Sequence, residues 1–292
     1  MSHIPVYRGR LAPTPSGHLH LGHARTFWIA HERARERGGQ LILRNEDLDR
    51  NRCKPEFVRD MIEDLRWFGF GWDEGPEIGG PFAPYSQSER LASYIETWRQ
   101  LHHTGLIYPS LHSRLDVQAA LIAPHDDLAE PLFPPELRPP QGAGSECTQP
   151  GEVNWRFRAP DGRTIVFYDD RLGEVCRTAG VDFGDFLIWR KDGSPSYELA
   201  VVADDHAMQI SEVARGEDLL TSTARQLLLY EALGWQPPEF YHCPLIRDEA
   251  GARLAKRTAA LSLRSLRQQG RTPEDIRQLP PFATQPFTVR HY

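Results

Sequence analysis

Apolar and polar residues alternate with two different periods along the first hundred positions. An apolar, strand-like run at 6–11 leads through a turn rich in proline and glycine into a helix-like run at 24–37. Residues 41–44 form a second strand-like run, and 55–68 carry apolar residues at helical spacing. A further helix-like run covers 91–106. Strands that alternate with helices in this way are typical of a parallel sheet covered by helices.

This pattern is interrupted between about 107 and 178. A stretch at 131–145 is rich in proline and glycine, which indicates an insertion or an extended loop. Two β-like runs, at 153–158 and 164–169, predict a small hairpin or meander. The alternating α/β pattern resumes near Asp185. We therefore predict an α/β fold in which a nucleotide-binding parallel sheet is split by an inserted subdomain.

The last part of the chain has a helix-like run at 221–233 and a strand-like run at 240–246. Beyond Leu266, proline and glutamine are frequent and apolar residues are few, so we expect a short, loosely ordered C-terminal extension. The predicted boundaries are 1–106 for the first half of the sheet, 107–184 for the inserted subdomain, 185–240 for the second half and 241–292 for the last segment.

Composition narrows the class of protein. The 292 residues are 40% hydrophobic and 25% charged, which is ordinary for a globular protein. No apolar run approaches the roughly 18 residues of a membrane helix, and four scattered cysteines form no disulfide framework. We therefore expect a cytoplasmic protein. A net charge of −6 neither supports nor excludes a nucleic-acid partner, because a local basic surface can suffice.

The tetrad His20-Leu21-Gly22-His23 stands between the turn and the helix-like run. A helix start with two imidazoles gathers N–H donors and the positive end of the helix, which suits the phosphates of a nucleotide. Gly22 would let a flat base approach the backbone. Alone, the tetrad is equally compatible with two surface histidines at a helix start.

A basic loop at 251–258 follows the strand-like run at 240–246. Lys256 is one of only three lysines among 34 basic residues, and Arg253 lies close by. A compact ammonium there suits a point charge that stabilises a triphosphate during reaction. The alternative is an ordinary solvated basic turn.

Together the two motifs resemble the HIGH and KMSKS signatures of class I aminoacyl-tRNA synthetases. Further motifs follow in the order found in glutamyl-tRNA synthetases, and the resemblance spans roughly residues 7–258. These motifs lie at 10–17, 43–49, 85–90, 185–193, 197–206 and 215–220. One departure is Asn45, where the family usually has isoleucine. The resemblance implies a class I Rossmann-like sheet whose insertion is similar to the one that holds the tRNA acceptor end in the family.

Within this family the chain resembles the short glutamyl-Q tRNA(Asp) synthetases, so no anticodon-binding domain is expected. These enzymes activate glutamate with ATP and attach it to the queuosine base at the wobble position of aspartate tRNA. The resemblance therefore implies L-glutamate, ATP with Mg²⁺ as counter-ion, and queuosine-bearing tRNA(Asp), without an obligatory protein partner. Two rival functions stay open: a glutamyl-tRNA synthetase core charging the tRNA 3′ end, and a non-catalytic paralogue acting as a binding module.

The resemblance also implies the residues that handle ATP. Activation needs alignment of the reactants and neutralisation of phosphate charge more than proton transfer. His20, His23 and Lys256 would be the catalytic residues. Gly22 and Arg253 would join them in binding ATP.

Glutamate binding is assigned in the same way. Arg10 and Arg215 match positions that bind the amino acid, and arginine pairs with a carboxylate through two parallel hydrogen bonds. Glu46 matches the partner of the substrate ammonium, Tyr197 a phenol that contacts the substrate, and Thr14 a position usually held by serine or threonine. The alternatives are a surface cation for Arg10, an acidic turn or metal site for Glu46, and core packing for Tyr197.

No metal site is expected. The run at 204–206, Asp-Asp-His, looks like a metal cluster, but the family carries it without using it as ligands, so we predict a structural role. Glutamyl-Q enzymes often hold zinc in the insertion. Here Ser110, Phe133 and Leu137 stand at ligand positions, and His112 alone is not a four-ligand site.

Overall fold

The computed structural model describes residues 6–111, 132–246, 262–279 and 282. The chain forms two compact units, which are described separately. Unit 1 contains 1–88, 210–217 and 243–292, and unit 2 contains 89–209 and 218–242. Short 3₁₀ helices, η1 (Gln87–Glu89) and η3 (Glu217–Leu219), occur where the chain passes between units. The four predicted domain ranges stay predictions.

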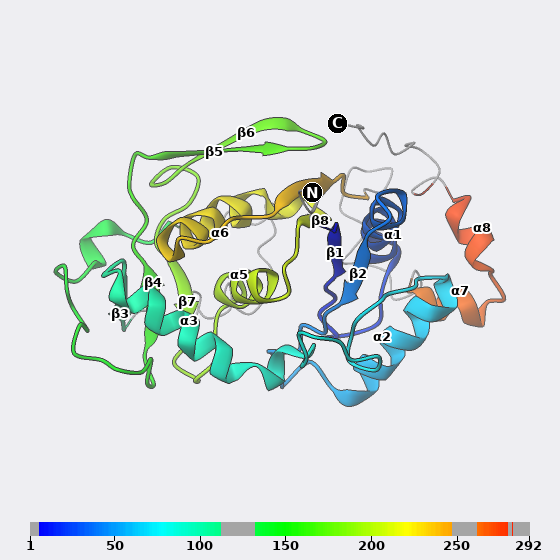
Figure 1. The fold of residues 1–292 in the computed structure, drawn as a ribbon, viewed down its shortest axis with the longest axis horizontal. Coiled ribbons are helices and arrows are strands. Elements are labelled where there is room, and N and C mark those ends of the chain that lie inside the picture. The colour runs from blue at the N-terminus through cyan, green and yellow to red at the C-terminus, as the bar shows by residue number, and fades with distance from the viewer. Residues whose placement is uncertain (1–5, 112–131, 247–261, 280–281, 283–292) are drawn as a thin grey trace, which may run out of the picture. The chain divides into compact units, whose positions relative to one another are not determined.

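Unit 1 is built on the parallel strands β1 and β2 and the helix α1 that connects them (Figure 1). Arg8 is paired with Gln40 and Leu11 with Leu43. Strand β8 runs beside β1. Just before β8, the Ser211 amide donates a hydrogen bond to the Arg8 carbonyl at 2.9 Å. The elements of this unit are β1 (Arg8–Leu11), α1 (Leu21–Glu36), β2 (Gln40–Leu43), α2 (Pro55–Phe68), β8 (Glu212–Gly216), α7 (Leu263–Gln268) and α8 (Pro273–Arg277).

Local signals set the bounds of the first two helices. Helix α2 covers the predicted 55–68, with Pro55 in its first turn and Gly69 ending it at φ 101°. Helix α1 begins at Leu21, earlier than the predicted 24, because the tetrad itself forms the first turn.

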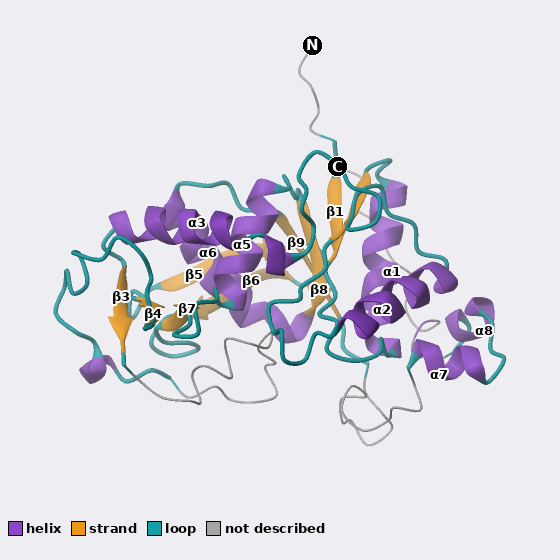
Figure 2. Cartoon of the chain, turned by 90° about the horizontal axis from the view of Figure 1, so that it is seen from below, coloured by secondary structure: helices purple, strands orange, loops and turns teal. Residues whose placement is uncertain are grey.

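The expectation of a loosely ordered tail beyond Leu266 was wrong for the residues up to 279. They form α7 and α8, and Leu263 and Ile276 are completely buried. Thr272 and Asp275 form a reciprocal capping box at the start of α8. Helix α7 packs against α2 (Figure 2). A few apolar residues at helical spacing are enough to form α7, because α2 supplies the surface against which they are buried.

The described residues of unit 2 form an antiparallel sheet in the order β3-β4-β7, the hairpin β5–β6, and the helices α3, α5 and α6. Strand β5 also pairs in parallel with β9, at Asp169 and Phe240. The elements are α3 (Leu91–His103), β3 (Ile107–Ser110), η2 (Pro135–Leu137), β4 (Asn154–Phe157), β5 (Thr164–Asp169), β6 (Gly173–Thr178), β7 (Phe186–Trp189), α5 (Tyr197–Ala207), α6 (Leu220–Leu233) and β9 (Glu239–Cys243).

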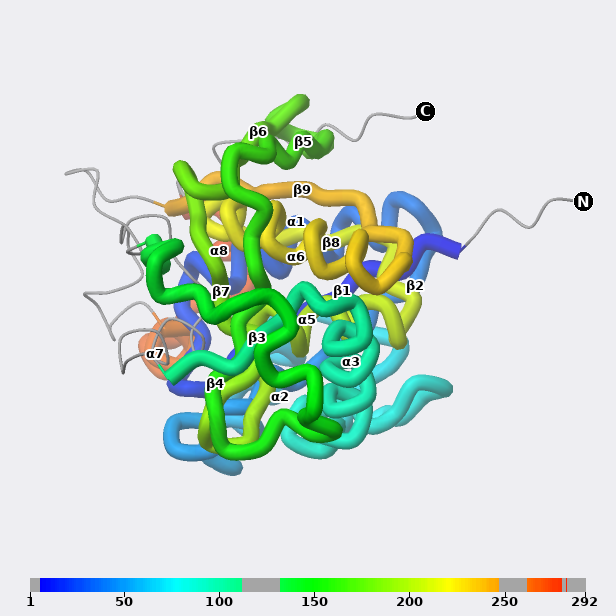
Figure 3. The backbone as a smooth tube through the Cα atoms, turned by 90° about the vertical axis from the view of Figure 1, so that its left-hand side faces the viewer, coloured from blue at the N-terminus to red at the C-terminus, as the bar shows by residue number. Residues whose placement is uncertain are grey.

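The predicted pairing of 153–158 with 164–169 was wrong. Strand β5 pairs with β6 instead, and β4 lies between β3 and β7. Gly173, at φ 78°, allows the short connection of the β5–β6 hairpin (Figure 3). Every residue of β4 is buried, as expected for a central strand.

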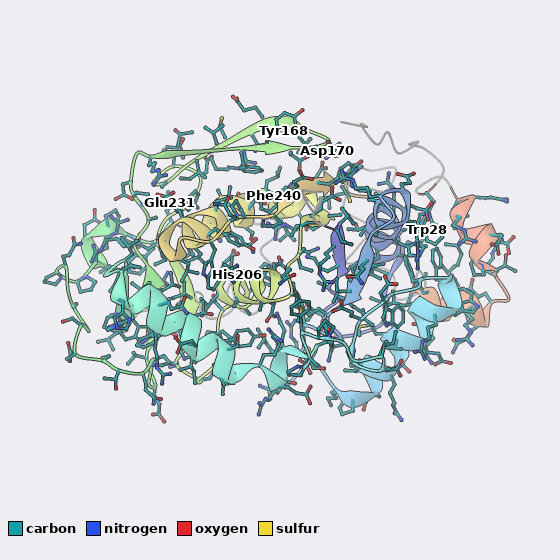
Figure 4. All side chains as sticks on the ribbon, viewed as in Figure 1. Trp28, Tyr168, Asp170, His206, Glu231 and Phe240 are labelled. Atoms are coloured by element: carbon teal, nitrogen blue, oxygen red, sulfur yellow. The ribbon has the colours of Figure 1, made fainter. Side chains whose placement is uncertain are left out.

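The β5–β6 hairpin has one buried and one exposed face. Ile165 and Phe167 are buried, while Val166 is exposed. Tyr168, which is labelled in Figure 4, is also exposed. At its base, Arg163 pairs with Glu231 of α6 at 2.7 Å. Among the described residues, no helix is long and apolar enough to cross a membrane.

Candidate active site

The His20 imidazole caps the start of α1. Its Nδ1 accepts a hydrogen bond from the Gly22 amide at 3.1 Å, so a neutral ring carries its proton on Nε2. The His23 ring stacks on it, with centroids 3.7 Å apart and planes 28° from parallel. The first turn of α1 contains no acidic residue. Two imidazoles therefore lie at the positive end of a helix, an arrangement suited to an anion.

Three predicted glutamate-binding residues lie at the carboxyl-terminal sides of the strands in unit 1. Arg10 of β1 is 5% exposed, Arg215 of β8 is 4% exposed, and Glu46, just after β2, is 6% exposed. Arg10 Nη1 donates to the Ala214 carbonyl at 3.1 Å, one residue before Arg215. Ligands of open α/β sheets bind beyond these strand ends. The burial of Arg10 and Glu46 argues against a surface cation and a solvated acidic turn.

Arg44 is a residue that the sequence analysis did not single out. Its side chain is fully buried. The guanidinium Nε and Nη2 donate to Oε1 of Glu46 at 3.2 and 2.9 Å. In the sequence, Arg44 follows a short apolar run, and an arginine at such a position can be either buried or exposed to solvent. The signal that identifies it is burial, which the sequence does not contain.

A buried ionic cluster fixes the start of β8, three residues before Arg215. The Glu212 carboxylate accepts two 2.7 Å hydrogen bonds from Arg33, and Arg37 lies 3.1 Å away. The Tyr7 hydroxyl also donates to Glu212, at 2.8 Å. Burial and the Glu212 charge raise the pKa of Tyr7 far above its usual value, so the phenol remains a donor. The cluster thus anchors β8 against α1.

A second cluster, formed by Arg8, Glu74 and Tyr85, anchors the first residue of β1. Arg8 donates to both oxygens of Glu74 at 2.9 and 3.1 Å, and the Tyr85 hydroxyl donates at 2.6 Å. Burial by itself would raise the pKa of Glu74, but these bonds outweigh it and the pKa is lowered. Burial and the neighbouring Glu74 raise the pKa of Tyr85 to about 12. At neutral pH this cluster therefore keeps one carboxylate and one phenol donor.

The described residues on both sides of 247–261 make hydrogen bonds to residues in or next to α1. On its amino-terminal side, Arg25 Nη1 donates to the Pro244 carbonyl at 3.0 Å. On its carboxyl-terminal side, the Leu263 amide donates to the Leu19 carbonyl at 2.7 Å. The chain therefore leaves and re-enters the described structure beside the tetrad.

The other four predicted site residues are Thr14, Tyr197, Arg253 and Lys256. Lys256 and Arg253 lie outside the described residues. Thr14 is exposed in the turn after β1. Tyr197 is half-buried at the start of α5 in unit 2, after the capping residue Ser196.

The Asp-Asp-His run at 204–206 makes structural contacts. Asp204 is buried and accepts hydrogen bonds from Arg90 at 2.6 Å and Tyr94 at 2.9 Å. His206 lies near the end of α5 (Figure 4), and its ring stacks on Trp235 with centroids 3.8 Å apart. Within the described ranges, no group of three or more His, Cys, Asp or Glu side chains is arranged to hold a metal ion.

A network of charges and rings occupies the part of unit 2 for which the sequence analysis expected no zinc site. Arg138, next to the ligand position Leu137, donates to both Asp185 oxygens at 2.7 Å. The Tyr108 hydroxyl donates to the same carboxylate at 2.6 Å. Phe133, at another ligand position, lies under the Arg156 guanidinium, 4.1 Å from the ring centroid.

The catalytic domain of the class I tRNA synthetases for glutamate and glutamine matches residues 7–120 and 136–279. The chain belongs to this family. The prediction of an α/β class I catalytic domain is thereby confirmed, and membership implies that ATP is used.

Individual relatives show which members of this family the chain is similar to. The chain is 45% identical to a glutamyl-Q tRNA(Asp) synthetase of Symbiobacterium thermophilum, over 92% of this chain and 83% of that protein. It is 44% identical to one of Nitratidesulfovibrio vulgaris, over 91% of this chain and 82% of that protein. A glutamate-tRNA synthetase structure from Elizabethkingia anophelis, 34% identical, superimposes with a TM-score of 0.71 over 86% of this chain and 53% of the other. The resemblance to the glutamyl-Q group is confirmed.

Proposed function

We propose that this chain activates L-glutamate with ATP and transfers the glutamyl group to the queuosine base at the wobble position of tRNA(Asp). The observation that carries the proposal is the 45% identity over 83% of the length of a glutamyl-Q tRNA(Asp) synthetase. The buried charges at the strand ends of unit 1 support the amino-acid part of this activity.

Recognition of glutamate requires partners for two carboxylates and one ammonium. Arg10 and Arg215 are the proposed carboxylate partners, because buried guanidinium groups bind carboxylates through paired, charge-assisted hydrogen bonds. Glu46 is the proposed partner of the ammonium. Thr14 and Tyr197 are proposed as further contacts to the substrate.

Activation joins a glutamate carboxylate oxygen to the α-phosphorus of ATP and breaks the bond to pyrophosphate. No net proton transfer is needed, so the protein contributes alignment and charge neutralisation. His20, through Nε2–H, His23 and Lys256 are the proposed donors to the phosphates, with Arg253 assisting. Gly22 is proposed to leave room for the adenine ring. Mg²⁺ accompanies the triphosphate as counter-ion.

In the second step, a hydroxyl group of the queuosine base attacks the glutamyl carbonyl and loses its proton, the bond to the phosphate oxygen breaks, and AMP departs. Unit 2, which includes the inserted region, is the proposed contact surface for the tRNA. No structural zinc and no obligatory protein partner are proposed.

The test is incubation with ATP, radiolabelled glutamate and tRNA with or without queuosine. Label should enter only queuosine-containing tRNA(Asp), and glutamate-dependent ATP–pyrophosphate exchange should occur without tRNA. Label on the 3′ end of tRNA lacking queuosine would favour a glutamyl-tRNA synthetase core instead. Absence of both exchange and labelling would favour the non-catalytic binding module.

A further inference from the structure

We propose that Arg44 is a positioning residue that holds the Glu46 carboxylate where it selects substrates bearing an α-amino group. This inference rests on the proposed function, in which Glu46 meets the ammonium of glutamate. Arg44 itself is not proposed to touch the substrate.

The backbone fixes both residues in one extended segment beyond β2. The Arg44 amide donates to the Leu11 carbonyl at 2.8 Å, and the Glu46 amide donates to the Pro13 carbonyl at 3.1 Å. In extended chain, residues two apart point to the same side. The two side chains are thus directed together at the ends of β1 and β2.

The side chains form a buried ion pair. Two Arg44 nitrogens, Nε and Nη2, donate to the same oxygen, Oε1 of Glu46. Arg44 is fully buried and Glu46 is 6% exposed, so each charge depends on a partner inside the protein. Arg44 therefore fixes the orientation of the Glu46 carboxylate before the substrate arrives. The Glu46 side chain then loses little further rotamer freedom when the substrate binds.

The fixed orientation of Glu46 favours ligands that carry an α-amino group over ligands that lack one. A fixed Glu46 strengthens the interaction with an ammonium, but it contributes nothing to a ligand that has the two carboxylates and no amino group. If Arg44 were merely structural, its loss would weaken both kinds of ligand equally. Glutarate is the matched ligand, because it has the carbon chain and carboxylates of glutamate without the amino group.

The decisive variant is Arg44→Lys, which keeps the charge but lacks the planar guanidinium that directs Nε and Nη2 together onto Oε1. We expect the Kd of glutamate, measured by calorimetry, to rise about 10- to 100-fold, the range for loss of hydrogen bonds to a charged group. The Kd of glutarate should change by less than about threefold. The KM of glutamate in pyrophosphate exchange should rise more than kcat falls.

A double-mutant cycle identifies the route of the effect. Glu46→Gln should weaken glutamate binding selectively, and adding Arg44→Lys to it should have no further selective effect. The matched control is Arg8→Lys, which alters another buried arginine–glutamate pair of unit 1, with Glu74. It should change the affinities for glutamate and glutarate by the same factor.

Equal loss of glutamate and glutarate affinity in Arg44→Lys would overturn the inference, as would full additivity with Glu46→Gln. Should Arg44→Lys fail to fold, Arg44→Gln, which keeps a donor without the charge, is judged by the same glutamate-to-glutarate ratio. Failure of the wild-type chain to bind glutamate at all would instead overturn the proposed function.

Discussion

The amide of Gly22 donates to Nδ1 of His20 at 3.1 Å, and the same glycine leaves the space in which that ring lies. A methyl group at Gly22 would come within 3.0 Å of the ring atoms Nδ1 and Cε1. A side chain at position 22 would therefore require the capping His20 ring to shift.

Gly22→Ala should displace the His20 ring and impair activation while glutamate binding is retained. We expect kcat of pyrophosphate exchange to fall by about tenfold or more, since displacements of about 1 Å can cost 100-fold. The Kd of glutamate should stay within about twofold. Gly17→Ala is the control, because a Cβ there meets nothing within 4 Å. Equal effects of the two substitutions would contradict the interpretation.

Lys256→Ala and His23→Ala should each reduce kcat of exchange about 100- to 1000-fold, the usual loss for one donor to developing phosphate charge. Their KM for glutamate should change little. Arg215→Ala should do the opposite and mainly raise the KM for glutamate, because a buried carboxylate loses its partner. A Lys256→Ala protein with intact kcat and a raised glutamate KM would refute the role given to the lysine.

Arg138→Met should destabilise unit 2 by about 3–5 kcal/mol, because it leaves the buried Asp185 charge without its guanidinium. Arg163→Met is the comparison, since its pair with Glu231 is about half exposed and is expected to contribute less than about 1 kcal/mol. Urea unfolding measures both. Similar losses in the two variants would show that the buried network does not hold the inserted region.

The purified protein should contain no stoichiometric zinc and keep its unfolding temperature in a chelator. A structural zinc supplies folding free energy directly, so its removal would lower that temperature. Elemental analysis and thermal unfolding with and without chelator decide the matter. About one zinc per chain, lost together with stability, would contradict the prediction.

Asp64→Asn should raise the free energy of unfolding at neutral pH. Burial in α2 raises the pKa of Asp64, although Arg264 lies 3.6 Å away and opposes this shift. Because the folded-state pKa lies above the unfolded value, the ionised carboxylate destabilises the fold at neutral pH. This cost disappears as the pH falls through the folded-state pKa. Urea titrations should therefore show the advantage of the variant shrinking on acidification; an advantage that grows would contradict the assigned direction.

Much of the local structure could be predicted because its causes lie within a few residues. Pro55 and Gly69 fix the two ends of α2, and the proline–glycine turn before the tetrad places His20 at a helix start. Capping and backbone preferences of this kind act over one turn, so the chain carries them in readable form. The motifs also sufficed for the family, since membership depends on residue identity and order.

Only the tertiary structure decided which strands pair and which charges are buried. Strand β4 pairs with β3 and β7 and not with β5, because pairing depends on surfaces distant in sequence. Likewise α7 exists because α2 covers it. Arg44 could not be distinguished from a solvated arginine until the fold enclosed it beside Glu46. The sequence alone determined the ends of α2, the motifs and the family; long-range packing determined the strand partners and the surroundings of the site.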